Sequence, residues 1–328
     1  MTQYDLVGIG NALVDIVAQA DDAFLAKHDL AKGGMMLIDP DRAAFLYDKM
    51  GAATESSGGS CGNTMAGFAS LGGAGAYIGK VRDDQFGGVF RHDMDAIGVS
   101  FTTPAATSGP ATGHCLVMVT PDAQRTMSTF LGAAADLSIA DIETDVIKAA
   151  KVTYLEGYLF DPPAAQQAFV AAAEIAHDAG RKVAITLSDS FCVERHREAF
   201  RALVEAHIDI LFANETEILS LYQVDKFDDA LQAVRGHCEI ACLTRSEKGS
   251  VVLSGEEVHV VDAEPVKSVV DTTGAGDLFA AGFLYGYTHG HGLADSARIG
   301  GVAAAEVIGH YGARPETDLA ALARQRLG

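Results

Sequence analysis

The sequence predicts an α/β fold in which a central, mostly parallel sheet is flanked by helices and carries a small β-sheet lid. From residue 150 onward, short apolar runs alternate with segments of helical periodicity, as in parallel βαβ units. The first half instead holds short strands of alternating character, which is typical of a separate small sheet. Because the chain contains no internal repeat and no low-complexity linker, we expect residues 1–328 to form a single domain.

The first half begins with a predicted strand, "YDLVGIGN", and continues with the strands of the expected lid. These lid strands lie within about 12–40 and 110–132 and read "DIVAQA", "GGMMLID", "GHCLVMVT" and "RTMSTFL". The segments "SCGNTMAGFASLG" and "DQFGGVFRHDMDAIG" are predicted to be helices. The lid strands have little core of their own, so we expect the lid to close over a ligand, with hinges around Gly33–Gly34 and near Gly113.

The second half is more regular. Strands are predicted at "KVTYLEG", "RKVAITLS", "IDILFAN" and "EIACLTR". The segment "PPAAQQAFVAAAEIAHDAG" begins with Pro and ends with Gly, as helices do, and "VERHREAFRALVEA", "ETEILSLY" and residues 228–236 are predicted to be helices as well. The runs "GSVVLSG" and "EVHVVDA" predict a β-hairpin just before the Gly-rich segment discussed below.

Composition limits the classes of partner. The formal net charge is −20 without a basic stripe, so we expect no binding to nucleic acid or to an anionic membrane. An anionic ligand would have to be held by backbone N–H groups, single arginines and a divalent cation. No apolar run is long enough to span a bilayer and the N-terminus does not resemble a secretory signal, so a cytoplasmic location is expected. The five scattered cysteines favour buried thiols over a zinc site.

Two nucleotide-binding motifs are excluded by their context. The run "GIGNAL" begins like a dinucleotide fingerprint, but Leu13 stands where the third small residue is needed, and no acidic residue follows at the end of a second strand. The chain also contains no G-x-x-x-x-G-K-[ST] sequence, so it has no P-loop.

The stretch "VVDTTGAGDLFAAGFLYGY" predicts an anion site beside a carboxylate. A helix that begins near Gly276 leaves its first N–H groups unpaired, and these donors suit a phosphate that is being transferred. Asp277 would lie next to them, in its charged form, as a base for an attacking hydroxyl. The alternative is an ordinary acidic residue in a first helical turn, and the local sequence favours neither.

Taken with its context, "DTTGAGDLFAAGF" resembles the C-terminal signature of the ribokinase-like (PfkB) family of sugar and nucleoside kinases. "GIGNALVDI", "GGSCGNTMAGFASLG" and "NETE" resemble other motifs of that family, in the same order. Within the family, "GNALVDI", "YLEGYLF", "LSDSF", "DILFANETE" and "DTTGAGD" are most similar to adenosine kinases. The resemblance covers nearly the whole chain.

The resemblance implies a set of ribose contacts and a phosphoryl-transfer site. The residues that would bind ribose hydroxyls are Asn11, Asp15, Gly58, Gly59, Ser60 and Asn63. Asp277 would be the base, Gly274, Ala275 and Gly276 the anion hole, and Arg125 the arginine that reaches the transferred phosphate. Judged without the resemblance, Arg125 would be a surface charge on a strand.

The resemblance also implies an apolar base pocket, formed by Leu13, Leu37, Cys115, Leu131 and Phe191. Phe191 could stack on a flat purine, although the same residues could simply be part of a core. Met35 stands where adenosine kinases often have Gln, which removes a polar contact to the base.

The resemblance also implies sites for metal ions and for the nucleotide. Asn214 and Glu217 would act through water on Mg²⁺, and they also form a capping-box pattern. Asp271 and Thr273 match positions that bind a monovalent cation such as K⁺. The expected ATP contacts are Asn214, Thr244, Gly249, Thr273, Gly274 and Gly276, and the adenine of ATP is expected near Val302.

The sequence thus predicts an ATP-dependent kinase that phosphorylates the 5′-hydroxyl of a purine nucleoside, adenosine to AMP in the first instance. Its alternatives are a sugar kinase for ribose or a ketohexose, and a catalytically silent nucleoside-binding regulator. We expect a monomer or a homodimer, in which pairing of two lids is the alternative to a mobile lid.

Overall fold

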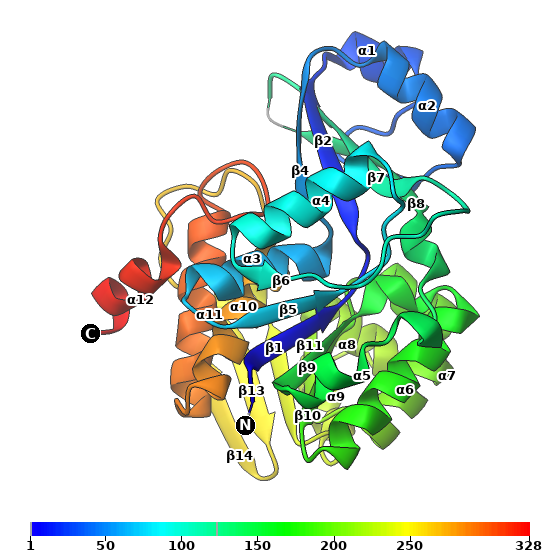
Figure 1. Ribbon diagram of the computed structural model, residues 1–328. Coiled ribbons are helices and arrows are strands. Elements are labelled where there is room, and N and C mark those ends of the chain that lie inside the picture. Colours follow the sequence, from blue (N-terminus) through cyan, green and yellow to red (C-terminus); the bar gives the residue numbers. More distant parts are fainter. Residues whose placement is uncertain (1, 123) are drawn as a thin grey trace.

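A computed structural model describes residues 2–122 and 124–328, and its largest element is a nine-stranded sheet with the order β14-β13-β12-β11-β10-β9-β1-β5-β6 (Figure 1). The strands are β1 Tyr4–Ile9, β5 Gly75–Ile78, β6 Val99–Ser100, β9 Ala150–Glu156, β10 Lys182–Thr186, β11 Ile210–Asn214, β12 Ile240–Thr244, β13 Ser250–Ser254 and β14 Glu257–Val261. The pairs from β12 through β11, β10, β9, β1 and β5 to β6 are parallel. β13 and β14 form the predicted antiparallel hairpin. The predicted mostly parallel α/β sheet is confirmed.

Helices cover both faces of this sheet (Figure 1). One face carries α5 Thr144–Lys148, α6 Pro163–Asp178, α7 Ser190–His207, α8 Glu215–Tyr222 and α9 Phe227–Val234. The other carries α3 Ser60–Ser70, α4 Gln85–Ala96, α10 Ala275–Thr288 and α11 Leu293–Val307, and α12 Leu319–Leu327 follows at the C-terminus. α10 and α11 pack closely because Gly282 faces Gly300, where a Cβ on Gly282 would come within 2.6 Å of the Gly300 Cα.

A second, five-stranded sheet stands apart from the large one, in the order β3-β8-β7-β2-β4 (Figure 1). Its strands are β2 Leu13–Gln19, β3 Met35–Leu37, β4 Ala53–Gly58, β7 Thr112–Val119 and β8 Arg125–Gly132, and it carries α1 Asp22–Lys27 and α2 Pro40–Lys49. β4 reads "ATESSG" and lies outside the predicted lid ranges, because its sequence has no apolar alternation. Val14, Ile16, Leu116 and Met118 pack with Leu25 and Leu46 in a core on one face of this sheet.

The chain crosses between the two sheets at glycines other than the predicted hinges. Gly59 (φ 80°) follows β4, and Gly132 (φ 50°) is the last residue of β8. Gly33 and Gly34 join α1 to β3 within the small sheet, so they do not link the two sheets. Gly113 is paired with Leu13 inside β7, where a Cβ would meet the Leu131 carbonyl oxygen at 2.3 Å. The expected hinge positions therefore do not coincide with these crossings, and the hinges stay a prediction.

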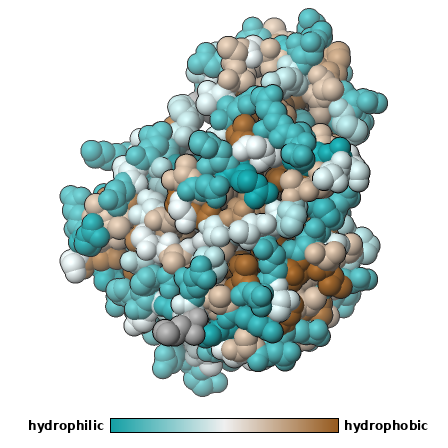
Figure 2. All heavy atoms as spheres, in the orientation of Figure 1, coloured by the Kyte–Doolittle hydropathy of each residue, from teal (hydrophilic) through white to brown (hydrophobic). Residues whose placement is uncertain are grey.

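Hydrophilic residues cover most of the face seen in Figure 2, with small hydrophobic patches between them, in line with the net charge of −20. Within residues 2–122 and 124–328, none of the helices combines the length and the apolar character that a membrane crossing requires.

Candidate active site

A cavity of about 660 Å³ lies between the two sheets. Its floor is formed at the carboxyl ends of parallel strands, by Asn11 after β1, Glu156 of β9, Thr186 of β10, Asn214 of β11 and Thr244 of β12. These ends meet at one edge because the strands are parallel, and ligands of open α/β sheets bind at this edge.

The small sheet forms the roof of the cavity through the alternation of its strands. The residues that line the cavity are Leu13, Asp15, Met35, Leu37, Cys115, Val117, Arg125, Met127, Thr129 and Leu131, while their even-numbered neighbours face the other way. Leu13, Leu37, Cys115 and Leu131 of the predicted base pocket are therefore brought together. Thr129 donates a hydrogen bond of 3.3 Å to the Cys115 Sγ, and burial raises the pKa of that thiol to about 12, so the thiol is neutral.

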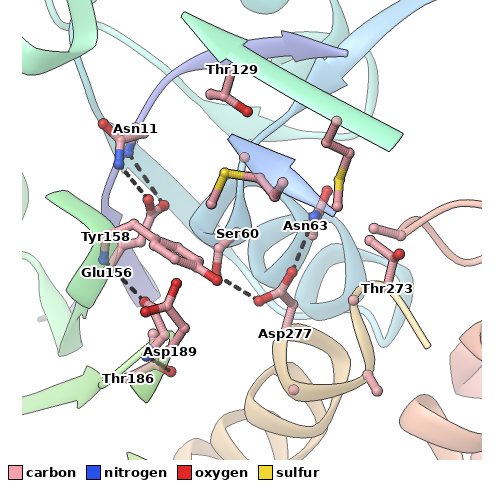
Figure 3. Close-up of a pocket in the computed structure, with 18 of the residues that line it drawn as sticks. Asn11, Ser60, Asn63, Thr129, Glu156, Tyr158, Thr186, Asp189, Thr273 and Asp277 are labelled. Atoms are coloured by element: carbon pink, nitrogen blue, oxygen red, sulfur yellow. Dashed lines mark hydrogen bonds between the residues drawn. The ribbon is translucent and has the colours of Figure 1, made fainter. Parts of the chain in front are cut away.

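Asp277 lies in the first turn of α10, behind the N-cap Gly274 with φ 80°. Ser60 Oγ donates to its Oδ1 at 2.6 Å and Asn63 Nδ2 donates to its Oδ2 at 3.0 Å (Figure 3). Burial raises the pKa of Asp277 to about 6, and the two hydrogen bonds oppose this rise. Burial thus outweighs the effect that the sequence predicted, in which the helix N-terminus favours the charged form.

The beginning of α10 keeps free donors. Gly274, Ala275 and Gly276 all line the cavity, as predicted for the anion hole. The N–H of Ala275 donates to the Thr272 carbonyl, whereas the N–H groups of Gly276 and Asp277 donate to no acceptor in the described part of the chain. An anion would therefore meet the N–H groups of Gly276 and Asp277 rather than that of Ala275.

Short polar side chains line the cavity beside Asp277, namely those of Asn11, Asp15, Ser60 and Asn63, together with Gly59. The Oδ1 atom of Asn11 is buried without a partner in the described residues. Gly58 does not line the cavity; it lies against Asp15, where a Cβ would come within 2.4 Å of the Asp15 carboxyl carbon. It therefore supports the position of Asp15 instead of contacting a ligand itself.

Glu156 is a buried carboxylate that sequence reasoning missed. It accepts hydrogen bonds from Asn11 Nδ2 at 2.6 Å, from Asn11 N at 3.3 Å and from Cys61 N at 2.8 Å (Figure 3). Burial raises its pKa to about 7. Glu156 fixes Asn11 and the beginning of α3, and an acidic residue at the end of the buried run "VTYLE" was the signal for it.

Arg125 lines the cavity and joins the small sheet to the segment before α10. Its Nη1 lies 2.8 Å from Asp271 Oδ2, and each side chain is less than a tenth exposed. Asp271 accepts four hydrogen bonds, from Arg125, from the N–H and hydroxyl of Thr273 and from Gly312 N. Its side-chain oxygens are therefore occupied, and Asp271 does not line the cavity. Binding of K⁺ at Asp271 and Thr273 stays a prediction.

The predicted magnesium residues form the capping box of α8. Asn214 Nδ2 donates to Glu217 Oε1 at 2.6 Å, and Glu217 N donates to Asn214 Oδ1 at 2.8 Å. Burial, together with the nearby charges of Asp189 and Asp277, raises the pKa of Glu217 to about 7. These three carboxylates line the same cavity, and a divalent cation would relieve their repulsion. Because the Asn214 and Glu217 side chains are hydrogen-bonded to each other, they are suited to binding Mg²⁺ through water molecules and not as direct ligands.

Of the other residues predicted to lie near ATP, some line the cavity and others do not. Thr244 and Thr273 line the cavity. Gly249 does not; its φ of 78° serves the turn before β13, where a Cβ would meet the Val261 carbonyl oxygen at 2.0 Å. Val302 is only 3% exposed within α11 and does not line the cavity either. Where β11, β12 and α10 border the cavity, its apolar lining is formed by Phe212, Ala213, Cys242 and Phe279.

Several lining residues were not named as site residues from the sequence, although some of them lie in the quoted segments "YLEGYLF" and "LSDSF". They are Met127, Thr129, Tyr158, Asp161, Thr186, Ser188, Asp189 and Arg195. Phe191 lines the cavity too, with 70% of its surface exposed. Most follow β9 and β10, so the rule that ligands bind beyond the carboxyl ends of parallel strands could have found them. In the described ranges, no group of three or more His, Cys, Asp or Glu side chains is arranged to hold a metal ion directly.

The chain is similar to known kinases over nearly its whole length. The chain is 52% identical to the solved structure of adenosine kinase from Sinorhizobium meliloti, with a TM-score of 0.92 and 99% of both chains covered. It is 50% identical to a probable sugar kinase protein from Rhizobium etli CFN 42, again with a TM-score of 0.92 and 99% coverage of both. It is also 28% identical over 317 residues to adenosine kinase from Saccharomyces cerevisiae, covering 90% of this chain and 92% of that relative. The family model for the pfkB family carbohydrate kinases matches residues 27–319. The chain belongs to the pfkB family of carbohydrate kinases.

Proposed function

We propose that this phosphotransferase transfers the γ-phosphoryl group of ATP to the 5′-hydroxyl of a purine nucleoside, with adenosine as the first candidate. The observation that carries the proposal is the composition of one cavity. Asp277 and the free N–H groups of α10 lie at one part of it, Asn11, Asp15 and Asn63 lie beside them, and an apolar lining from the small sheet completes it. A nucleoside has the matching order of hydroxyl, ribose and flat apolar base.

The roles follow from the contacts. Asp277 accepts the proton of the 5′-hydroxyl as that oxygen forms its bond to the γ-phosphorus, and the bond from this phosphorus to the leaving ADP oxygen breaks. The N–H groups of Gly276 and Asp277 stabilise the negative charge on the transferred group. Asp15 and the unpartnered Asn11 Oδ1 accept hydrogen bonds from ribose hydroxyls. Arg125 lies in the same cavity and supplies positive charge to it.

Mg²⁺ would be held through water by Glu217 and Asn214, in the cavity that Asp189 and Asp277 also line. When bound, it neutralises charge on the phosphates of ATP. The residues of the chain do the rest: they orient the nucleoside and, with the small sheet above, exclude water from the phosphoryl group.

Similarity to an adenosine kinase at 52% identity supports the nucleoside, whereas similarity to a probable sugar kinase at 50% identity keeps a sugar as the second candidate. The apolar lining distinguishes the two, because a free sugar would leave it in contact with water.

The test is a screen of nucleosides, ribose and fructose with ATP and Mg²⁺, following ADP release. We expect kcat/KM for adenosine to exceed that for ribose by at least about 100-fold, since the base adds several kcal/mol of apolar contact. The same screen with Asp277→Asn excludes a contaminating kinase. If kcat/KM for ribose or fructose equals that for adenosine, the nucleoside assignment is wrong. If no substrate is turned over, both kinase assignments are wrong and the interpretation as a catalytically silent nucleoside-binding protein takes their place.

A further inference from the structure

Arg314 is a charged residue near Asp277 that no motif identified. It lies in the loop between α11 and α12 and is partly buried. This loop is held against the beginning of α10: Gly312 N donates to Asp271 Oδ2 at 3.0 Å, and a Cβ on Gly274 would come within 2.8 Å of the Ala313 Cα. The position of Arg314 is thus tied to the helix that carries Asp277.

The guanidinium of Arg314 makes a bridge to α3 and to β4. Its Nε donates to Asn63 Oδ1 at 3.0 Å, and its Nη2 donates to the Ser57 carbonyl at 2.8 Å and to the Ser57 Oγ at 3.1 Å. Ser57 is itself fixed, because its N–H donates to Asp93 Oδ2 at 2.7 Å. Two donors in a rigid plane therefore reach two elements at once, a geometry that only arginine provides.

This bridge decides which way the Asn63 amide faces. Asn63 has one oxygen and one NH₂, and the two are interchangeable by rotation of the amide. Because Arg314 is a donor without any acceptor, it binds the oxygen and leaves the NH₂ to face Asp277. In the opposite orientation, Asn63 would present its oxygen to the carboxylate and repel it.

Arg314 also supplies charge. The titratable or charged groups that act on Asp277 or feel it are Asp15, Cys61, Tyr154, Glu156, Tyr158, Glu217 and Arg314. Arg314 is the cation in this set, and it forms no ion pair within the described residues. Its charge therefore acts on the neighbouring carboxylates, Asp15 and Asp277 among them.

We propose that Arg314 is a positioning residue for phosphoryl transfer: it orients the Asn63 amide toward Asp277 and supplies the positive charge that faces this base. The proposal rests on the proposed function, in which Asp277 takes the hydroxyl proton. Arg314 itself does not line the cavity, so it would not contact a substrate bound there. Its effect on catalysis passes through Asn63 and through the ionisation of Asp277.

Two substitutions separate orientation from charge. Arg314→Met removes both, so we expect kcat to fall about 10- to 100-fold, the loss typical of a misplaced catalytic group. Without the cation, the acid limb of kcat/KM should move to higher pH by about one unit. Arg314→Lys keeps the charge but cannot bridge Asn63 and Ser57, so kcat should fall while the acid limb stays close to that of the wild type.

The control is Arg91→Met. Arg91 also bridges two residues, through the carbonyls of Phe101 at 2.6 Å and Thr103 at 2.9 Å, and like Arg314 it does not line the cavity. A merely structural role for Arg314 would give both methionine variants the same outcome, a lower melting temperature with an unchanged acid limb. If Arg314→Met does not fold, Arg314→Lys and the cycle below decide.

A double-mutant cycle with Asn63→Ala tests whether Arg314 acts on catalysis through Asn63. If Arg314 acts through Asn63, substituting Arg314 should lower kcat much less in the Asn63→Ala background than in the wild type. Full additivity, or an Arg314→Lys variant with wild-type kcat, would overturn the proposal. Failure of the proposed function looks different: Asp277→Asn would then retain activity. If Asp277→Asn is inactive while the Arg314 variants keep full activity, the role of Arg314 is refuted and the proposed function stands.

Discussion

Ser60 Oγ donates a hydrogen bond of 2.6 Å to Asp277 Oδ1, although the two residues are 217 positions apart in the sequence. Ser60 begins α3 and Asp277 lies in the first turn of α10. The helices pack so closely that a Cβ on Gly67 would come within 2.4 Å of the Leu278 Cδ1. The carboxylate is therefore held from the helix that follows the small sheet, and its aim depends on how the two helices pack.

The first prediction concerns the base. Asp277→Asn should lower kcat about 10²- to 10⁴-fold, because an amide cannot take the hydroxyl proton. The Kd for adenosine, measured by calorimetry, should change little, since the shape of the site is kept. Asp228→Asn, an exposed acid in the first turn of α9, is the matched control. Retention of most of the wild-type kcat would falsify the role of Asp277.

The second prediction is the pH dependence of kcat/KM. Burial raises the pKa of Asp277 to about 6, from its usual value of 3.8. A carboxylate acts as a base only when it is ionised, so activity should fall as the pH drops through about 6. A pH–rate profile between pH 4.5 and 8.5 checks this, with fluorescence to confirm that the fold persists. An acid limb near pH 4 would contradict the burial of Asp277.

The third prediction is a stability change at Glu156. Its pKa in the folded protein is raised to about 7 from 4.5, so its protonated form favours the fold. This contribution is fully present below pH 4.5 and is lost as the pH rises through about 7. The free energy of unfolding of Glu156→Gln relative to wild type should therefore increase over this range, by up to about 3 kcal/mol.

Urea denaturation at several pH values measures this difference. The control is Glu256→Gln, since the Glu256 side chain is 96% exposed. A difference between Glu156→Gln and wild type that does not vary with pH would mean that Glu156 is ionised throughout.

The fourth prediction concerns the base pocket. Phe191 lines the cavity but is 70% exposed, so its ring is available to stack on a purine. Phe191→Ala should raise KM for adenosine about 3- to 10-fold and leave any ribose turnover unchanged. Tyr311→Ala, at a residue 52% exposed and outside the cavity, serves as control. Equal losses for adenosine and ribose would remove Phe191 from the base pocket.

The fifth prediction is that the small sheet closes over the nucleoside. Met35 and Leu37 of β3 line the cavity and are 46% and 53% exposed, and closure would remove them from water. Hydrogen exchange should show new protection in β3 and β8 when adenosine is added. If two subunits instead pair through this sheet and lock it, protection will be equal in the free and bound states.

Much of the fold could be predicted because its signals are local. Alternating strands and helices after residue 150, the β13–β14 hairpin and the beginning of α10 depend on periodicity and on Pro and Gly within a few residues. β4 was missed for the same reason: "ATESSG" has no apolar pattern, and its strand exists because it pairs with β2. The residues of β2, β3, β7 and β8 that line the cavity are all odd-numbered because side chains alternate along strands, a pattern that can be read from the sequence once the strands are known.

The tertiary structure decided which charged and polar side chains meet. Segments far apart in the chain are joined by the hydrogen bond between Asn11 and Glu156, the ion pair between Arg125 and Asp271, and the hydrogen bond between Arg314 and Asn63. No short motif in the sequence records such pairs. The sequence placed Asp277 at a helix N-terminus and so predicted that it would be readily ionised. Packing of α3, the small sheet and the C-terminal loop around it removed water and raised its pKa instead. Local sequence determines the chemistry that a residue can perform, but desolvation depends on every element that surrounds it, and only the folded chain brings those elements together.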